Sequence, residues 1–154
     1  MDGNSVSVER VIEAAAPEIF ALLADTGRHA EFDGSGTVGG ERSRSRLLTL
    51  GSSFTMAMRG RRETLFVPYR TTSTVIEFVQ DRLIAWQTYG PARLIGGRIW
   101  RYELMPNENG TLVRETWDIA QEKFRSVVIG KSLPRQTEEG MRVTLDRIAT
   151  RLSP

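Results

Sequence analysis

The sequence predicts an α+β fold in which one curved antiparallel sheet of about seven strands wraps around a long C-terminal helix, with two short helices after the first strand. Three observations predict it. Apolar and polar residues alternate with a period of two through the middle of the chain, as in strands with one buried face. Helical patterns occur near both ends. The turns between the strand-like segments are too short for the crossovers that parallel neighbours need, which favours antiparallel pairing.

The N-terminal part of the chain predicts a strand and then two helices. A first strand is predicted by period-two alternation, in which one set of residues alternates with another: Val6, Val8, Arg10 and Ile12 with Ser5, Ser7, Glu9 and Val11. Pro17 suits the first turn of a helix, where its missing N–H is no loss, and this helix is expected to end at Asp25-Thr26-Gly27. A second short helix is predicted over Arg28–Phe32.

Six further strands are predicted before the last helix. One irregular strand is expected within residues 37–50, and a regular one follows Gly51. Four more are rich in β-branched or aromatic residues and are separated by turn-forming residues. These four are Tyr69–Gln80, Leu83–Tyr89, Arg98–Met105 and Thr111–Ile119.

The C-terminal segment predicts the one helix that is long enough to cover the sheet. Four apolar residues recur at helical spacing and form one stripe. They are Met141, Leu145, Ile148 and Leu152. Pro134 marks the expected start of the helix, and Glu138 and Arg142 form a supporting i,i+4 pair. A curved sheet around such a helix leaves a gap, which is a typical place for a ligand cavity.

Composition indicates one globular domain over residues 1–154 and excludes several classes of site. The 154 residues are 40% apolar and 26% charged, as in folded globular proteins. Cysteine is absent, which excludes disulfides, a thiol nucleophile and cysteine-ligated metal. The longest apolar run, Ile19–Ala24, is too short to span a membrane. The first residues lack the features of a secretory signal, so a cytoplasmic location is expected.

The basic residues are almost all arginine, with only Lys123 and Lys131 as lysines. The net charge is +2, and genome composition alone can produce such a bias. The alternative is a surface that binds nucleic acid or an anionic membrane. Its footprint would be Arg42, Arg44, Arg46, Arg59, Arg61 and Arg62. Stacking aromatics do not interrupt this run, so the sequence favours the compositional interpretation.

Short motifs along nearly the whole chain match one superfamily. The matching segments are Val8–Ala14, Ala16–Asp25, Gly51–Phe54, Val75–Phe78, Ala85-Trp86, Trp100–Leu104, Gly110–Val113, Gly140-Met141 and Thr144-Leu145. They resemble the polyketide cyclase/dehydrase-like proteins of the SRPBCC superfamily, which has the START-like, helix-grip fold of the birch-pollen allergen. The motifs are patterns of strand hydrophobes, so the resemblance concerns fold more than activity. It implies a hydrophobic or amphipathic small ligand, in some members a polyketide that is cyclised.

The familiar signatures of catalysis are missing from the sequence. It contains no nucleophile elbow, phosphate-binding loop or dinucleotide fingerprint. His29 is the one histidine, and because no Ser or Cys motif accompanies it, we expect a solvated surface residue rather than a general base. No Asp/Glu cluster has a spacing suited to metal, so neither a metal nor a cofactor is expected.

Strand register predicts which side chains share the inner face. Placing Leu104 opposite Val113 pairs Glu103 with Arg114 on the outer face, a favourable cross-strand pair. The same register brings several aromatic and charged residues together under the last helix. The predicted cavity residues are Ile76, Phe78, Ile84, Trp86, Arg98, Trp100, Tyr102, Glu115, Trp117, Met141 and Leu145.

Arg98 and Glu115 have two interpretations, since an unpaired buried charge costs several kcal/mol. In the first, they and Tyr102 satisfy one another inside a packed core or lie in water near the sheet edge. In the second, they form a polar floor that orients a ligand with hydroxyl or carboxylate groups. The first hypothesis for function is therefore a small-molecule binder. An alternative is a polyketide cyclase/aromatase or dehydratase, in which Arg98 would stabilise an enolate and Glu115 with Tyr102 would move protons. An Arg-rich protein- or nucleic-acid-interaction module is the third.

Overall fold

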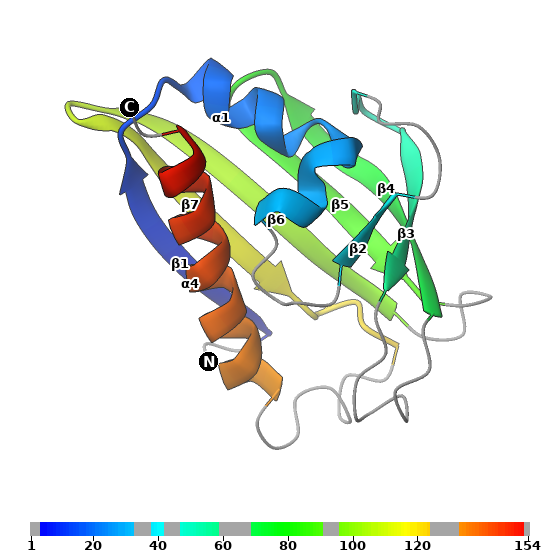
Figure 1. Cartoon of the computed structure of the whole chain (residues 1–154). Helices are drawn as coiled ribbons and strands as arrows, with labels where there is room; N and C mark the ends of the chain where they lie inside the picture. Colours follow the sequence, from blue (N-terminus) through cyan, green and yellow to red (C-terminus); the bar gives the residue numbers. More distant parts are fainter. Residues whose placement is uncertain are drawn as a thin grey trace.

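The computed structural model describes residues 4–32, 38–41, 47–58, 69–90, 96–123 and 133–152. Their seven strands form one antiparallel sheet in the order β1-β7-β6-β5-β4-β3-β2 (Figure 1). The strands are β1 (Ser5–Ile12), β2 (Val38–Glu41), β3 (Ser53–Met58), β4 (Tyr69–Val79), β5 (Leu83–Tyr89), β6 (Gly96–Asn107) and β7 (Gly110–Asp118). The helices are α1 (Ala16–Leu23), α2 (His29–Phe32) and α4 (Leu133–Leu152). The predicted α+β class, antiparallel sheet and C-terminal helix are confirmed.

Several boundaries differ from the prediction. The second helix is split into a 3-10 turn at Thr26–Arg28 and the four-residue α2. The β6–β7 hairpin is longer than expected, because the ladder continues to the pair Asn107↔Gly110 and so includes Pro106. The Asn107 side chain closes the turn by accepting a hydrogen bond from the Asn109 amide at 2.8 Å. Of the region 37–50, β2 forms a short strand, and residues 42–46 lie outside the described residues.

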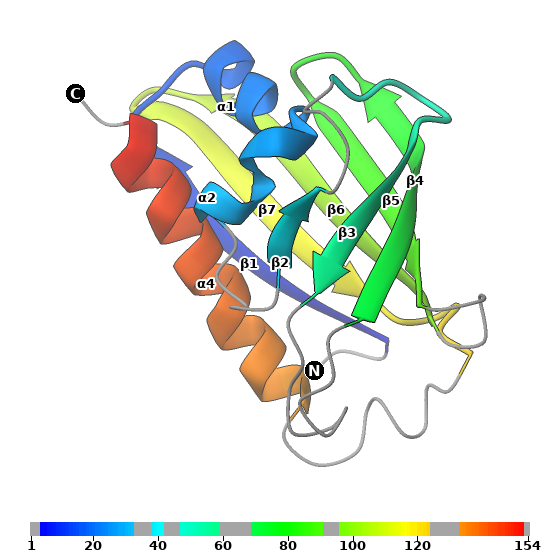
Figure 2. The same ribbon diagram turned by 45° about the vertical axis from the view of Figure 1, so that its right-hand side comes forward.

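The helices cover one face of the sheet, which is its concave face (Figure 2). α4 runs along β1, and Arg10 of that strand forms an ion pair with Asp146 of the helix. The predicted apolar stripe is confirmed: Met141, Leu145 and Ile148 are buried, and Leu152 packs against the same core. No helix in the described part of the chain is both long and apolar enough to cross a membrane.

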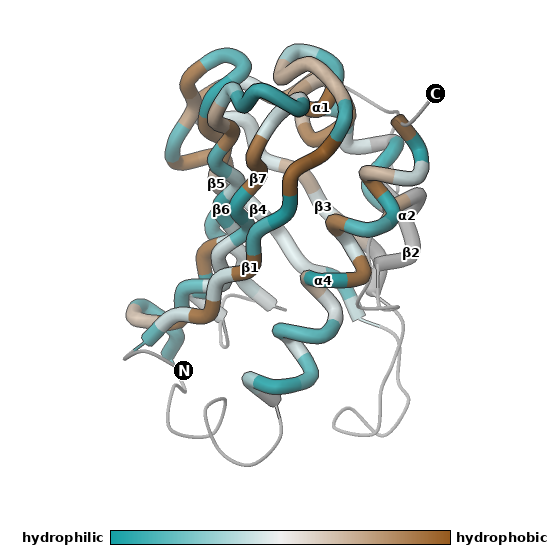
Figure 3. The backbone as a smooth tube through the Cα atoms, turned by 90° about the vertical axis from the view of Figure 1, so that its left-hand side faces the viewer, coloured by the Kyte–Doolittle hydropathy of each residue, from teal (hydrophilic) through white to brown (hydrophobic). Residues whose placement is uncertain are grey.

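The core lies between the concave face and the helices. β1 contains both hydrophobic and hydrophilic residues (Figure 3), and its buried side chains, Val6, Val8 and Ile12, lie on the one face of the strand that is turned to the core. The largest fully buried side chains are Trp117, Phe20, Ile12, Ile19, Leu22, Leu23, Leu48, Ile84, Leu104, Ile119, Met141 and Leu145. They come from both layers, so the helices and the sheet stabilise each other through burial of apolar surface.

Candidate ligand-binding site

The sheet register arranges the predicted site residues in two neighbouring rows on the concave face. Directly opposed residues of antiparallel strands share a face. The tryptophan row runs across β4, β5, β6 and β7 as Val75, Trp86, Trp100 and Trp117. The acid row lies beside it as Phe78, Ile84, Tyr102 and Glu115. The predicted pairs Tyr102 with Glu115, Trp100 with Trp117, and Glu103 with Arg114 are all present.

The acid row contains a buried hydrogen bond. The Tyr102 hydroxyl donates to Oε1 of Glu115 at 2.8 Å, and Glu115 is only 2% exposed. A carboxylate removed from water needs strong donors, and a hydroxyl that donates to it supplies one. Trp86 lies against Tyr102 with 5.7 Å between ring centroids, so the two rows are in contact. The predicted contact between Tyr102 and Glu115 is therefore present as a hydrogen bond to one carboxylate oxygen, Oε1.

Trp117 supplies the tryptophan row with a polar group that makes no hydrogen bond to any described residue. Its side chain is 0% exposed, and its indole Nε1 has no hydrogen-bond partner there. Such a buried donor costs about 1–3 kcal/mol relative to a satisfied one. Its ring lies 6.4 Å from that of Trp100, which is only half-buried. The concave face therefore holds a donor in an otherwise apolar setting.

His29 is a buried member of the aromatic cluster, so the expectation of a solvated surface histidine is wrong. It is 5% exposed and stacks on Trp86 with 5.2 Å between centroids and 20° between planes. Its ring also makes edge contacts with the rings of Phe32 and Phe54. Its Nε2 donates to the Leu23 carbonyl oxygen at 2.8 Å. The i,i+3 spacing of His29 and Phe32 places both on one helix face and could have indicated this burial.

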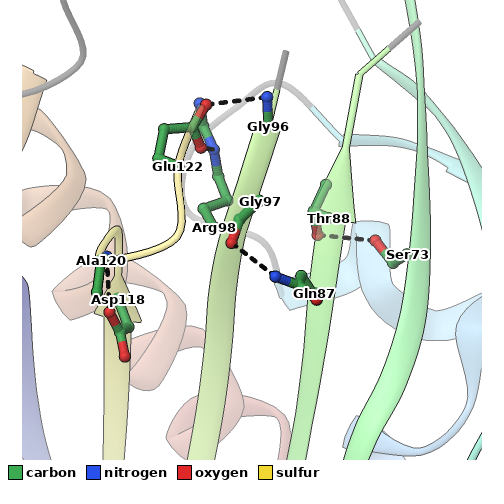
Figure 4. A network of polar contacts seen from close by, with 9 residues as sticks. All are labelled: Ser73, Gln87, Thr88, Gly96, Gly97, Arg98, Asp118, Ala120 and Glu122. Atoms are coloured by element: carbon green, nitrogen blue, oxygen red, sulfur yellow. Dashed lines mark hydrogen bonds and ion pairs between the residues drawn. The ribbon is translucent and has the colours of Figure 1, made fainter. Parts of the chain in front are cut away.

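Arg98 pairs with Glu122, so the proposed pairing of Arg98 with Glu115 is wrong. Its Nε donates to Glu122 Oε2 at 3.1 Å (Figure 4). The other carboxylate oxygen of Glu122 accepts the Gly96 amide at 3.0 Å. The chain after β7 turns back over the start of β6, which brings Glu122 to Arg98. Cross-strand register cannot reveal a partner that follows the end of the strand.

The other predicted cavity residues divide into two groups. Ile84, Trp86, Met141 and Leu145 are buried in the core cluster, and Phe78 packs against it with its ring 5.3 Å from that of Phe20. Ile76 is instead 37% exposed, so its assignment to the cavity wall is wrong. A bulge between Val75 and Glu77 breaks the simple alternation and places Val75 opposite Trp86.

Described residues of α4 line two grooves. One, of about 400 Å³, follows Val143, Asp146, Arg147, Thr150 and Arg151. The other, of about 180 Å³, lies between α4 and β1, with Val8 and Leu145 among its lining. No group of three or more side chains suited to hold a metal ion is found among the residues that the structure describes.

The proposed nucleic-acid footprint lies outside the described residues. It comprises Arg42, Arg44, Arg46, Arg59, Arg61 and Arg62.

Comparison with known proteins finds relatives of unknown activity and solved structures of the same fold. No protein-family model matches the chain. The chain is 38% identical over 122 residues to the uncharacterised protein Rv0088 of Mycobacterium tuberculosis and to its counterpart in a second strain. The match covers 77% of the chain and 50% of the relative, so the chain spans about half the length of these relatives.

Three solved structures resemble the chain closely in fold. CV1439 of Chromobacterium violaceum has a TM-score of 0.72 at 14% identity, with 99% of each chain covered. DynU16, a protein of the dynemicin biosynthetic locus, has a TM-score of 0.69 at 14% identity, with 97% of this chain and 47% of that chain covered. An AHSA1-like protein from Aeromonas hydrophila has a TM-score of 0.63 at 19% identity, with 95% and 90% covered. The chain therefore shares the fold of these solved structures.

Proposed function

We propose that this chain, with its SRPBCC-like fold, binds an amphipathic small molecule on the concave face of its sheet. The observation that carries the proposal is the buried indole N–H of Trp117, which has no hydrogen-bond partner among the described residues. A ligand oxygen that accepted this hydrogen would remove the cost of leaving it unsatisfied. The hydrogen-bonded pair of Tyr102 and Glu115 adds a second polar group two residues away on the same face.

The surroundings of these polar groups suit a ligand that is largely apolar. Trp86 and Trp100 lie in the same row as Trp117. Their flat aromatic side chains offer large surfaces to rings or hydrocarbon chains. A few polar groups in an apolar setting are the usual composition of a small-molecule site. Trp100 is the partly exposed member of the tryptophan row, and Arg98, two residues before it on β6, is also partly exposed, so the ligand would enter beside these two residues.

Tryptophan emission and mass spectrometry of the full chain test this proposal. Native mass spectra of protein purified from its own host should show a bound small molecule. Adding that molecule to the stripped protein should change indole emission, and Trp100→Leu should reduce the change. Met105→Leu, on an exposed position of β6, is the matched control and should leave the response intact. Binding that neither Trp100→Leu nor Trp117→Phe weakens would contradict a concave-face site.

A second candidate function is catalysis of the polyketide cyclase, aromatase or dehydratase type. The observation that favours it is the buried hydrogen bond between the Tyr102 hydroxyl and Glu115, since paired groups of this kind can move a proton. Glu115 would take a proton from the carbon between two carbonyls, and Tyr102 would donate to the enolate oxygen. Glu115→Gln should then abolish turnover of a poly-β-keto substrate while binding persists. Equal turnover by Glu115→Gln would eliminate this candidate.

A further inference from the structure

A third row of side chains on the concave face adjoins the tryptophan row and contains three polar residues. The register runs from Phe54 through Ser73 and Thr88 to Arg98. Ser73 Oγ and Thr88 Oγ1 lie 2.8 Å apart and hydrogen-bond to each other. Thr88 and Arg98 each stand two residues from a tryptophan on the same strand, so their side chains point to the same face as the tryptophan row. Polar and flat apolar surface are therefore adjacent.

Glu122 binds Arg98 through one nitrogen of the guanidinium group, Nε. It accepts from Nε at 3.1 Å and is itself anchored by the Gly96 amide at 3.0 Å (Figure 4). The side chain of Glu122 is 1% exposed, whereas that of Arg98 is 29% exposed. A guanidinium has five N–H donors. The terminal nitrogens of Arg98 make no hydrogen bond to any residue that the structure describes, so no described residue uses the other four donors.

We propose that Arg98 binds a carboxylate of the ligand, whose apolar part then lies on Trp100 and Trp86. The inference rests on the proposed function and names its ligand class, an amphipathic carboxylic acid. The planar fork of an arginine matches a carboxylate with two parallel hydrogen bonds. Partial burial strengthens the attraction between the charges relative to water. Because Arg98 already shares its charge with Glu122, a singly charged carboxylate suits it better than a doubly charged phosphate.

Matched acid and amide probes test this inference. Calorimetric titration of the full chain uses two pairs, 2-naphthoic acid against 2-naphthamide and dodecanoic acid against dodecanamide. Each acid differs from its amide mainly in charge, so the affinity ratio reports the carboxylate contact. We expect one acid to bind about 10- to 100-fold more tightly than its amide, the ratio that a charge-assisted hydrogen-bonded pair supplies. The pair that shows it identifies the apolar part as flat or extended.

Two variants assign the preference to Arg98. Arg98→Met alone would leave buried Glu122 without its cation, so the test variant is the double change Arg98→Met with Glu122→Gln, which keeps an acceptor for the Gly96 amide. It should bind acid and amide equally, with amide affinity changed less than about twofold. Arg101→Met is the control, because Arg101 is also half-buried and ion-paired, to Glu77 at 2.6 Å, in a separate row of the sheet. It should keep the acid preference.

The outcomes separate this inference from the proposed function. Equal affinity of the unmodified chain for acid and amide would overturn the carboxylate contact and leave a concave-face site for neutral ligands. An acid preference lost equally in Arg101→Met would overturn it too, because the effect would be one of overall charge. Failure of all four probes to bind would count against both the inference and the proposed function.

Discussion

Glu115 and Glu122 are two nearly inaccessible carboxylates whose donors differ. Glu115 lies within the concave face and accepts from the Tyr102 hydroxyl, a neutral donor. Glu122 follows β7 and accepts from a cation, Arg98, and from the Gly96 amide. A buried carboxylate is stable only when such donors replace water. Glu115 therefore belongs to the candidate site. Glu122 fixes the turn after β7 to the start of β6 at Gly96.

At the residue scale, Tyr102→Phe should destabilise the fold by about 1–3 kcal/mol. The change keeps the ring and removes the hydroxyl, so Glu115 Oε1 loses this donor inside the protein. Urea denaturation monitored by circular dichroism gives the free energy of unfolding. Tyr69→Phe is the control, because Tyr69 is half-buried and its hydroxyl makes no hydrogen bond to a described residue; it should cost less than about 0.5 kcal/mol. Equal costs would mean that the Tyr102 hydroxyl contributes nothing.

A double-mutant cycle should assign the partner of Arg98. Arg98→Met leaves Glu122 buried without its cation and should cost roughly 2–4 kcal/mol, somewhat less than a fully buried pair because Arg98 is partly exposed. Adding Glu122→Gln should recover part of that loss. Combining Arg98→Met with Glu115→Gln should give additive costs, since these residues do not pair. Additive costs for Arg98 and Glu122, together with coupling between Arg98 and Glu115, would show that Arg98 pairs with Glu115 instead.

At the element scale, α4 is held by one stripe of side chains. Leu145→Ala should cost about 2–5 kcal/mol, because it removes a fully buried side chain and leaves a cavity. Val143→Ala, on the exposed face of the same helix, should stay within about 0.5 kcal/mol. Thermal and urea denaturation of both variants compare the two faces. A small effect of Leu145→Ala would show that α4 does not hold the core together.

The turn after β7 depends on a glycine in β6. Gly97 has φ 112°, and a Cβ there would overlap the carbonyl oxygen of Gln121. Gly97→Ala should therefore cost about 3 kcal/mol or more, because the backbone of one of the two segments must move. Gly51 has φ 84° with nothing within 4 Å, so Gly51→Ala should cost only about 1–2 kcal/mol of backbone strain. Similar losses in both variants would show that the contact at Gly97 is not tight.

At the scale of the whole molecule, a ligand on the concave face lies between the sheet and the helices and should stabilise the entire fold. A ligand at a hundredfold excess over its Kd adds about 2.7 kcal/mol to the free energy of unfolding. For a chain of this size that corresponds to a rise in Tm of about 5–11 °C. A thermal screen of polyphenols, fatty acids, sterols and isoprenoid quinones measures it. A ligand that changes tryptophan emission without raising Tm would not be bound specifically to the folded state.

The sequence by itself determined most of the elements and the register of one hairpin, β6–β7. Alternation identified the strands from Tyr69 onward, and the stripe of Met141, Leu145 and Ile148 identified the face of α4 that is buried. The pairing of Leu104 with Val113 followed from the short hairpin, and it correctly brought Tyr102 to Glu115. These features depend on local periodicity and on turn length, which a single chain displays directly.

Only the tertiary structure decided the contacts that periodicity does not encode. The bulge in β4 places Val75 opposite Trp86 and leaves the predicted cavity residue Ile76 partly exposed, because one extra residue shifts the later side chains relative to the partner strand. The turn after β7 brought Glu122 to Arg98, and the packing of α2 on the sheet buried His29 against Trp86. Each of these contacts depends on how distant parts of the chain are placed relative to one another. The packing of the core sets that placement. The spacing of residues along the sequence does not reveal it.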